Sequence, residues 1–263
     1  MDEVLTELHD GWAEVILNRP ERKNAIVGPL GVELERAINK LNVDPDVRLI
    51  LLRGNEGAFC SGLDLKAFNE NPEPDWVKDF QKIWRGAHSA LFNCKKPIVG
   101  ALEKYAINGG AALALSCDLL VSGEEAFIQV GEARIGMAAP YNLAWLSLRH
   151  PESVISRITL IGDRIPGKEL RRLGLAQRVV ADVDVLGEAR SLAVELAGFP
   201  EDGLRRIKTV MRAAQRLTAD EWFDQYNYEV VVDKKYLPKR ILELFKKDPV
   251  SLKPWDPMGA LAR

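Results

Sequence analysis

Cysteine and histidine are scarce in this sequence, with three residues of each type among 263. Cys60, Cys94 and Cys117 are too few and too widely spaced for a disulfide framework. Neither the cysteines nor the isolated histidines show the spacing of metal ligands, so we expect no metal site and no histidine-centred nucleophile. The cysteines should therefore be reduced side chains that pack in the interior.

An excess of one charge and long hydrophobic runs are also lacking. The net charge is −2, with 47% apolar and 28% charged residues, as in ordinary globular proteins. Without a concentrated basic face, the chain is not expected to bind nucleic acid. No apolar run reaches the ~18 residues of a membrane span, and residues 1–4 show neither the basic nor the apolar part of a signal peptide. We expect a cytoplasmic protein that does not associate with membranes.

Strands, glycine turns and helices alternate along most of the chain. The predicted elements, in chain order, are strands 4–8, 13–17 and 47–52, a helix ending at 42, helix 75–93, strand 97–102, helix 109–116, strand 117–122, helices 140–150, 154–161 and 166–173 with a turn at 164–166, and helices 185–198, 201–215 and 218–247. This order favours a parallel sheet with right-handed helical connections, although periodicity alone leaves a spiral and a doubly wound sheet open. The length suits one α/β domain with a terminal helical extension.

Two glycine turns carry the strongest functional signal. Residues 57–66, Gly-Ala-Phe-Cys-Ser-Gly-Leu-Asp-Leu-Lys, follow an apolar strand, and Ile107-Asn108-Gly109-Gly110 opens a helix further along. Gly62 allows a close backbone approach, so the N–H of Leu63 can face a ligand. The N–H of Gly109 would lie at the positive end of its helix. Two such donors can stabilise one oxygen that gains negative charge, and each is typically worth ~10²–10³ in rate.

Together with Asn18-Arg19-Pro20, Asn24-Ala25-Ile26 and Leu173-Gly174-Leu175-Ala176, these turns resemble the crotonase superfamily, the enoyl-CoA hydratase/isomerase family of acyl-CoA enzymes. The resemblance spans residues 4–215. It implies an α/β fold in which residues 1–184 form a crotonase-like spiral of ββα units that holds the acyl-CoA site. Residues 185–263 would form a C-terminal helical region that builds a homotrimer, or a dimer of trimers, and covers part of the pocket. Coenzyme A would be the substrate carrier, with no permanently bound cofactor.

The resemblance also implies roles for individual residues. Leu63 and Gly109 would donate the two N–H groups of an oxyanion hole for the thioester oxygen. The coenzyme A groove would be formed by Arg22, Lys23, Ala25, Ser61, Gly62, Leu63, Asp64, Leu65, Lys66, Gly109 and Gly110. Asp64 is expected to stabilise its turn rather than act as a base. Basic pairs at 234–235, 239–240 and 246–247 would suit coenzyme A phosphates at a subunit boundary, or would form a solvated helical face.

The family's general acid/base position falls on Glu132, within Gly-Glu-Ala-Arg-Ile-Gly at 131–136. Family hydratases have a second glutamate three residues after the oxyanion glycine, and this chain has Ala112 there. One carboxylate can take a proton from one carbon of a 3-enoyl thioester and return it two carbons away, whereas hydration is naturally shared by two carboxylates. The sequence therefore favours double-bond isomerisation.

The acyl end of the pocket departs from the family pattern, because residues 137–143 read Met-Ala-Ala-Pro-Tyr-Asn-Leu. Ala112, Tyr141 and Asn142 are predicted to line the substrate pocket, where a hydroxyl or an amide could replace part of the missing glutamate's role. Tyr141 and Asn142 could equally cap the following helix. Weak hydration, thioester hydrolysis, decarboxylation and non-catalytic acyl-CoA binding stay open as alternatives. A carboxylate retained beside an intact oxyanion hole favours catalysis over binding alone.

Overall fold

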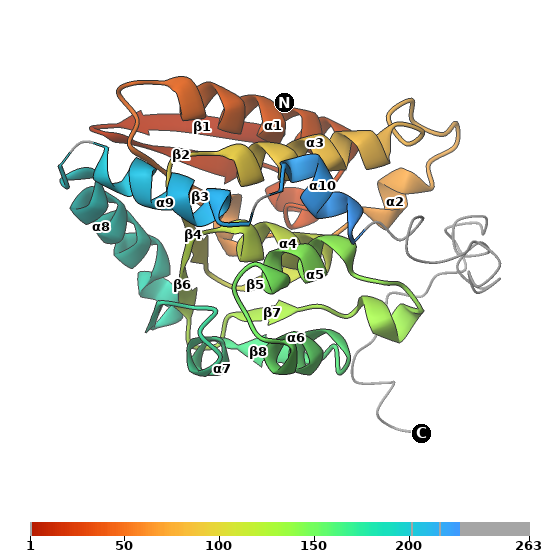
Figure 1. Cartoon of the computed structure of the whole chain (residues 1–263). Helices are drawn as coiled ribbons and strands as arrows, with labels where there is room; N and C mark the ends of the chain where they lie inside the picture. Colours follow the sequence, from red (N-terminus) through yellow and green to blue (C-terminus); the bar gives the residue numbers. More distant parts are fainter. Residues whose placement is uncertain (1, 201, 216, 227–263) are drawn as a thin grey trace.

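The computed structural model describes residues 2–200, 202–215 and 217–226 (Figure 1). Its strands are β1 (Val4–His9), β2 (Trp12–Leu17), β3 (Leu49–Gly54), β4 (Ile98–Leu102), β5 (Tyr105–Ile107), β6 (Leu119–Gly123), β7 (Phe127–Gln129), β8 (Arg164–Pro166) and β9 (Arg178–Val180). The larger sheet has the order β1-β2-β3-β4-β6-β9, and the smaller has the order β5-β7-β8. In the larger sheet only the β1–β2 hairpin pair is antiparallel.

Helices cover both faces of the larger sheet (Figure 1). They are α1 (Gly28–Val43), α2 (Leu65–Phe68), α3 (Phe80–Asn93), α4 (Gly109–Ser116), α5 (Pro140–Ser147), α6 (Glu152–Thr159), α7 (Gly167–Arg172), α8 (Val185–Ala197), α9 (Gly203–Ala213) and α10 (Ala219–Asp224). α8 packs on one face, against Trp12, Leu51 and Val99, and α1, α3 and α4 pack on the other. Every residue of β2 and β3 is buried, which explains their nearly continuous apolar sequences.

Successive strand pairs divide between the two sheets. β4 joins the larger sheet and β5 the smaller, and β6 and β7 repeat this division. The chain leaving β3 follows the same path, because Cys60 forms a parallel bridge with Ala106 of β5. The fold is therefore the predicted α/β spiral of ββα units, and its repeats bring the two glycine turns side by side.

Four short strands were not predicted. β5, β7, β8 and β9 have three residues each, too few for an alternating pattern to be visible. β8 occupies residues 164–166, which were predicted as a turn, and pairs with β7. α3 begins at Phe80 rather than at residue 75, and α2 lies where only a turn and loop were predicted. Tertiary pairing, rather than local pattern, determines these segments.

The chain beyond residue 185 is helical as far as the structure describes it. α8 and α9 match the predicted helices 185–198 and 201–215. α10 begins with a capping box formed by Thr218 and Glu221. The remainder of the predicted helix 218–247, with its basic pairs, lies outside the described residues. The division of the chain into a spiral core, residues 1–184, and a C-terminal helical region, residues 185–263, stays a prediction. In the described part of the chain, no helix is both long enough and apolar enough to cross a membrane.

Candidate active site

The turn after β3 lies beside Ile26. Gly62 has φ +91°, and a Cβ added there would lie 3.0 Å from the carbonyl oxygen of Ile107. The N–H of Ile26 donates to Gly62 O at 2.8 Å, and the N–H of Asp64 donates to Ile26 O at 3.0 Å. In this parallel bridge the N–H of Leu63 points away from Ile26, and it donates to no acceptor among the described residues.

The turn before α4 packs directly on the first turn. The N–H of Ile107 donates to Cys60 O at 3.0 Å, and a Cβ added at Gly110 would lie only 2.5 Å from that oxygen. Asn108 has φ +51° and ψ −113°, a conformation that costs a non-glycine residue about 1–3 kcal/mol. The strained residue immediately precedes Gly109, which begins α4. The two predicted N–H donors, Leu63 and Gly109, therefore belong to turns in direct contact.

Glu132 begins the 3₁₀ turn η3 (Glu132–Ile135) and is 8% exposed. Its Oε1 accepts a hydrogen bond from Asn142 Nδ2 at 2.9 Å, whereas its buried Oε2 has no partner among the described residues. Burial outweighs the hydrogen bonds and raises the pKa of Glu132 from 4.5 to about 7. A carboxyl group with such a pKa can accept and donate a proton near neutral pH.

The predicted pocket residues separate into two environments. Ala112 is fully buried in the first turn of α4 and brings no ionisable group. Asn142, on the first turn of α5, is 2% exposed and bonds to Glu132, and neither it nor Tyr141 caps that helix. Tyr141 instead stacks on His88, with ring centroids 4.3 Å apart. The structure thus joins Asn142 to Glu132 and places Tyr141 in an aromatic cluster.

This aromatic cluster includes His88, which was not predicted as a site residue. His88 is fully buried on α3, and its Nδ1 accepts a hydrogen bond from Trp145 Nε1 at 2.9 Å. Burial lowers the pKa of His88 to about 3, so the ring is neutral at physiological pH with its proton on Nε2. Trp84, one helical turn earlier, has Cζ2 3.9 Å from a Cβ built at Gly109. The i, i+4 spacing of Trp84 and His88 is the feature of the sequence that could have indicated this aromatic cluster.

The predicted coenzyme A residues surround Asp64. Its Oδ1 lies 2.8 Å from Arg22 Nη2 and accepts the Ala67 N–H at 3.2 Å, and its Oδ2 lies 3.1 Å from Arg19 Nη1. Burial raises the pKa of Asp64, but the hydrogen bonds from Arg22, Ala67 and Arg19 outweigh it and lower the pKa overall. Asp64 therefore stabilises the turn, and the charge of Arg22 is already paired.

The remaining predicted coenzyme A residues form one patch around this turn. The N–H of Ser61 donates to Lys23 O at 3.1 Å, and Ala25 O accepts from Arg19 Nη1 at 2.6 Å. Leu65 and Lys66 are exposed at the start of α2. Residues 22–25 and 61–66 thus come together, with Gly109 and Gly110 on the adjoining turn. Arg19, which belongs to the Asn-Arg-Pro segment, links the two segments through Ala25 and Asp64.

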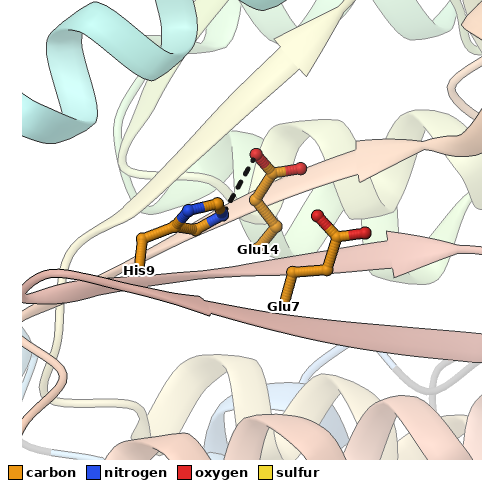
Figure 2. A group of neighbouring side chains, drawn as sticks. All are labelled: Glu7, His9 and Glu14. Atoms are coloured by element: carbon orange, nitrogen blue, oxygen red, sulfur yellow. Dashed lines mark ion pairs between the residues drawn. The ribbon is translucent and has the colours of Figure 1, made fainter.

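Glu7, His9 and Glu14 offer ligand atoms within 4.8 Å of one another on the β1–β2 hairpin (Figure 2). Glu14 is fully buried and already accepts hydrogen bonds from Arg53 at 2.5 Å and from Arg190 at 2.6 Å. Burial raises the pKa of Glu14, but these two guanidinium groups outweigh it and lower the pKa overall. Both carboxylate oxygens are therefore engaged in ion pairs that connect β2 to β3 and α8, which does not favour metal binding.

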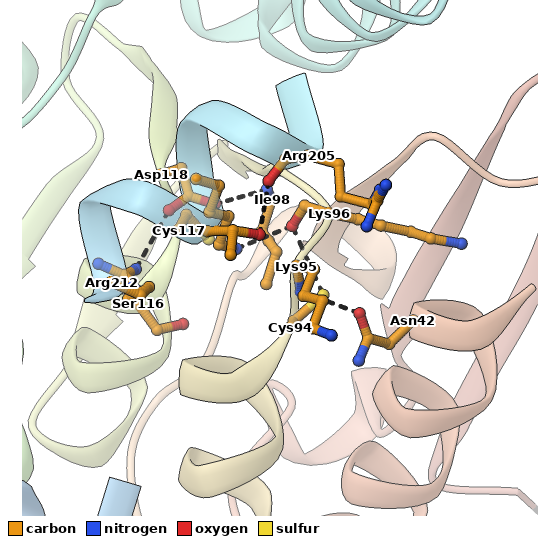
Figure 3. Close-up of polar contacts among 12 residues, drawn as sticks. Asn42, Cys94, Lys95, Lys96, Ile98, Ser116, Cys117, Asp118, Arg205 and Arg212 are labelled. Atoms are coloured by element: carbon orange, nitrogen blue, oxygen red, sulfur yellow. Dashed lines mark hydrogen bonds and ion pairs between the residues drawn. The ribbon is translucent and has the colours of Figure 1, made fainter. Parts of the chain in front are cut away.

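Asp118, directly before β6, lies among three cationic side chains (Figure 3 shows Asp118 and Arg212). Its carboxylate oxygens lie 2.6 Å from Lys208 Nζ, 3.2 Å from Arg212 Nη2 and 3.4 Å from Arg149 Nη2. The N–H of Ile98 also donates to Asp118 at 2.8 Å. These contacts attach α9 to the edge of the core and contribute no group to the candidate active site.

The three cysteines are free and buried, as predicted.

Comparison with known proteins gives a consistent result along most of the chain. A family model described as enoyl-CoA hydratase/isomerase matches residues 7–237. A carnitinyl-CoA dehydratase of Proteus mirabilis is 30% identical over 228 residues, covering 86% of this chain and 85% of the relative.

Solved structures show the same similarity in three dimensions. A monofunctional enoyl CoA isomerase from M. smegmatis is 26% identical, with a TM-score of 0.69 and coverage of 86% of this chain and 99% of that one. An enoyl-CoA hydratase from Mycobacterium tuberculosis H37Rv is 27% identical, with a TM-score of 0.72 and coverage of 88% and 90%. The chain thus resembles proteins whose names describe dehydration, isomerisation and hydration.

Proposed function

The chain belongs to the enoyl-CoA hydratase/isomerase family, and we propose that it moves the double bond of an enoyl-CoA thioester, with Glu132 as its single proton shuttle. One observation carries the proposal. Glu132 is a buried carboxyl group with a pKa of about 7, and Ala112 occupies the position where family hydratases have a second carboxylate.

In the proposed reaction, the Glu132 carboxylate removes a proton from the α-carbon of a 3-enoyl thioester. The electron pair of the broken C–H bond moves into a dienolate, whose negative charge collects on the thioester oxygen. The N–H groups of Leu63 and Gly109 receive that charge. Glu132, now a carboxylic acid, returns the proton to the γ-carbon, which leaves the double bond conjugated with the thioester. No water is consumed, so one carboxyl group is sufficient.

The patch formed by residues 22–25 and 61–66 is assigned to coenzyme A. Lys23 and Lys66 are exposed there, and neither forms an ion pair within the described part of the chain. Their charges are therefore available for phosphate groups. Arg22 and Arg19 already pair with Asp64, which holds both side chains in the turn.

A direct test measures isomerisation by the purified protein. With trans-3-hexenoyl-CoA, the absorbance of the conjugated thioester should rise, and Glu132→Gln should slow this by ~10²–10⁴-fold because it removes the general acid/base. Glu125→Gln, at an exposed position, is the matched control. No turnover by the wild type, or equal turnover by Glu132→Gln, would overturn the proposal. Release of a free coenzyme A thiol would indicate thioester hydrolysis instead.

Hydration is the second candidate, and the similarity to a carnitinyl-CoA dehydratase and to an enoyl-CoA hydratase supports it. With Glu132 alone, hydration of crotonyl-CoA should be slow, because the general acid/base contribution of a second carboxylate is typically ~10²–10⁴-fold. Ala112→Glu should therefore accelerate loss of the crotonyl-CoA absorbance, with Ala114→Glu on the same helix as the control for a new buried charge. If Ala112→Glu does not hydrate crotonyl-CoA faster than the wild type, segment 137–143, which departs from the family pattern, does not support the geometry that hydration needs. Binding without turnover would instead indicate an acyl-CoA binding protein.

A further inference from the structure

We propose that Asn142 is a positioning residue that holds the Glu132 carboxylate and the Gly109 donor peptide in one fixed arrangement. The inference rests on the proposed function, and it adds a residue that supports both halves of the site. Asn142 contacts Glu132 and Asn108, and it touches neither the thioester oxygen nor the migrating proton. It acts through its two neighbours.

Both hydrogens of the Asn142 amide are used. Nδ2 donates to Glu132 Oε1 at 2.9 Å and to the carbonyl oxygen of Asn108 at 3.1 Å. The Asn108 carbonyl can only accept, so the NH₂ group, rather than Oδ1, must face these two partners. One nitrogen thus connects the acid/base group to the turn before α4.

The contact with Asn108 reaches the predicted oxyanion donor through the peptide bond. The Asn108 carbonyl and the Gly109 N–H belong to one planar trans peptide group and point in opposite directions. A donor bound to the carbonyl oxygen therefore fixes the direction of the Gly109 N–H, and it also polarises that group. The N–H of Ala112 also donates to the Asn108 carbonyl at 3.1 Å, so Asn142 is the second donor that holds this oxygen, at a residue whose positive φ is unfavourable by itself.

The contacts close into a ring. The Asn108 side chain accepts the N–H of Gly131 at 2.8 Å, and Gly131 is joined covalently to Glu132. Glu132 Oε1 returns to Asn108 through Asn142. Oε1 is therefore held, while Oε2, which has no partner among the described residues, is the oxygen left for proton transfer. The ring keeps the distance between base and donor constant while the proton moves.

Asn142→Leu tests this arrangement, because leucine has a similar volume and no donor. Loss of the amide removes a hydrogen bond to the charged form of Glu132. The pH at which the rate of isomerisation changes with ionisation of Glu132, the kinetic inflection, should therefore rise by about one pH unit. Misplacement of the donor peptide should lower kcat by ~10²-fold with little change in KM. Gln129→Leu is the control, because Gln129 is a second buried amide nearby whose Nε2 bonds to Gly162 O at 3.0 Å. Its inflection should match that of the wild type.

Infrared titration of the Glu132 carboxyl band, identified by its loss in Glu132→Gln, gives a readout that needs no turnover. The band should titrate at higher pH in Asn142→Leu, and also in the isosteric Asn142→Asp, which places a second carboxyl group against Glu132. Suppose that the wild type isomerises 3-hexenoyl-CoA. If Asn142→Leu then has the same kinetic inflection, the same kcat and the same infrared titration as the control Gln129→Leu, the positioning role is overturned. If the band shifts but the wild type turns over no enoyl-CoA, the positioning role stands and the proposed function fails.

Discussion

At the scale of single residues, the ionisation of Glu132 should destabilise the fold. Its pKa is about 7 in the folded protein, against 4.5 for the ordinary group, so between these values the folded state holds the extra proton. The free energy of unfolding must therefore fall as pH rises through this window, by about 1.4 kcal/mol per pH unit. Stability is given up here to obtain a group that exchanges protons near neutral pH.

Glu132→Gln should consequently be more stable than the wild type at pH 8, by about 3 kcal/mol, because glutamine stays neutral. Near pH 4.5 the difference should largely disappear, since the wild-type carboxyl group is protonated in the folded state. Urea unfolding at both pH values, with Glu125→Gln for comparison, measures this. A stability difference that is the same at the two pH values would contradict the raised pKa.

At the scale of elements, Asp118 joins α9 to the larger sheet. Its carboxylate is the counter-charge for Lys208, Arg212 and Arg149, and its own side chain is 13% exposed. Burial raises the pKa of Asp118, but the three neighbouring cations outweigh it and lower the pKa overall. Removing one partner of a buried charge cluster typically costs about 3–5 kcal/mol, because the remaining charges stay buried without compensation.

Asp118→Asn should therefore lower the free energy of unfolding by about 3 kcal/mol while keeping the shape of the side chain. Asp163→Asn is the control. The ion pair of Asp163 with Arg157 is 2.7 Å long, its side chains are 39% and 32% exposed, and exposed pairs contribute about 0–1 kcal/mol. Chemical denaturation of both variants checks the prediction. Equal losses would mean that burial of the Asp118 cluster adds nothing.

At the scale of the whole molecule, we expect a homotrimer or a dimer of trimers. α9 carries an apolar stripe, Ile207, Val210 and Met211, whose exposed fractions in the single chain are 61%, 68% and 50%. Their i, i+3, i+4 spacing places them on one side of the helix. A stripe of this kind suits a contact with another subunit.

The mass measured by analytical ultracentrifugation should accordingly correspond to three or six copies of the 29.3 kDa chain. Val210→Asp should shift this assembly towards the monomer, because it places a charge in the stripe. Leu8→Asp, at a residue on β1 that is 64% exposed, is the control and should leave the assembly unchanged. A monomeric wild type would contradict the prediction. An intact trimer in Val210→Asp would place the interface elsewhere.

Much of the fold could be predicted from the sequence, because its signals are local. The signals for strands 4–8 and 13–17, for the apolar run that became β3 and for the helix that became α1 each lie within a short window. The strands β5, β7, β8 and β9 could not be found this way. Three residues have no readable period, and only their partners in another repeat of the spiral make them strands.

The two glycine turns and the family follow from the sequence alone, because close approach and positive φ require glycine at fixed positions. The sequence also determined that residue 112 has no carboxylate. The burial and the hydrogen-bond partner of Glu132 come from the folding of the chain. Its pKa depends on burial, and its partner Asn142 reaches it and Asn108, 34 residues earlier, through the packing of α5 on α4. Such long-range contacts leave no local pattern, so the sequence could indicate the single carboxylate but not its burial, its raised pKa or its contact with Asn142.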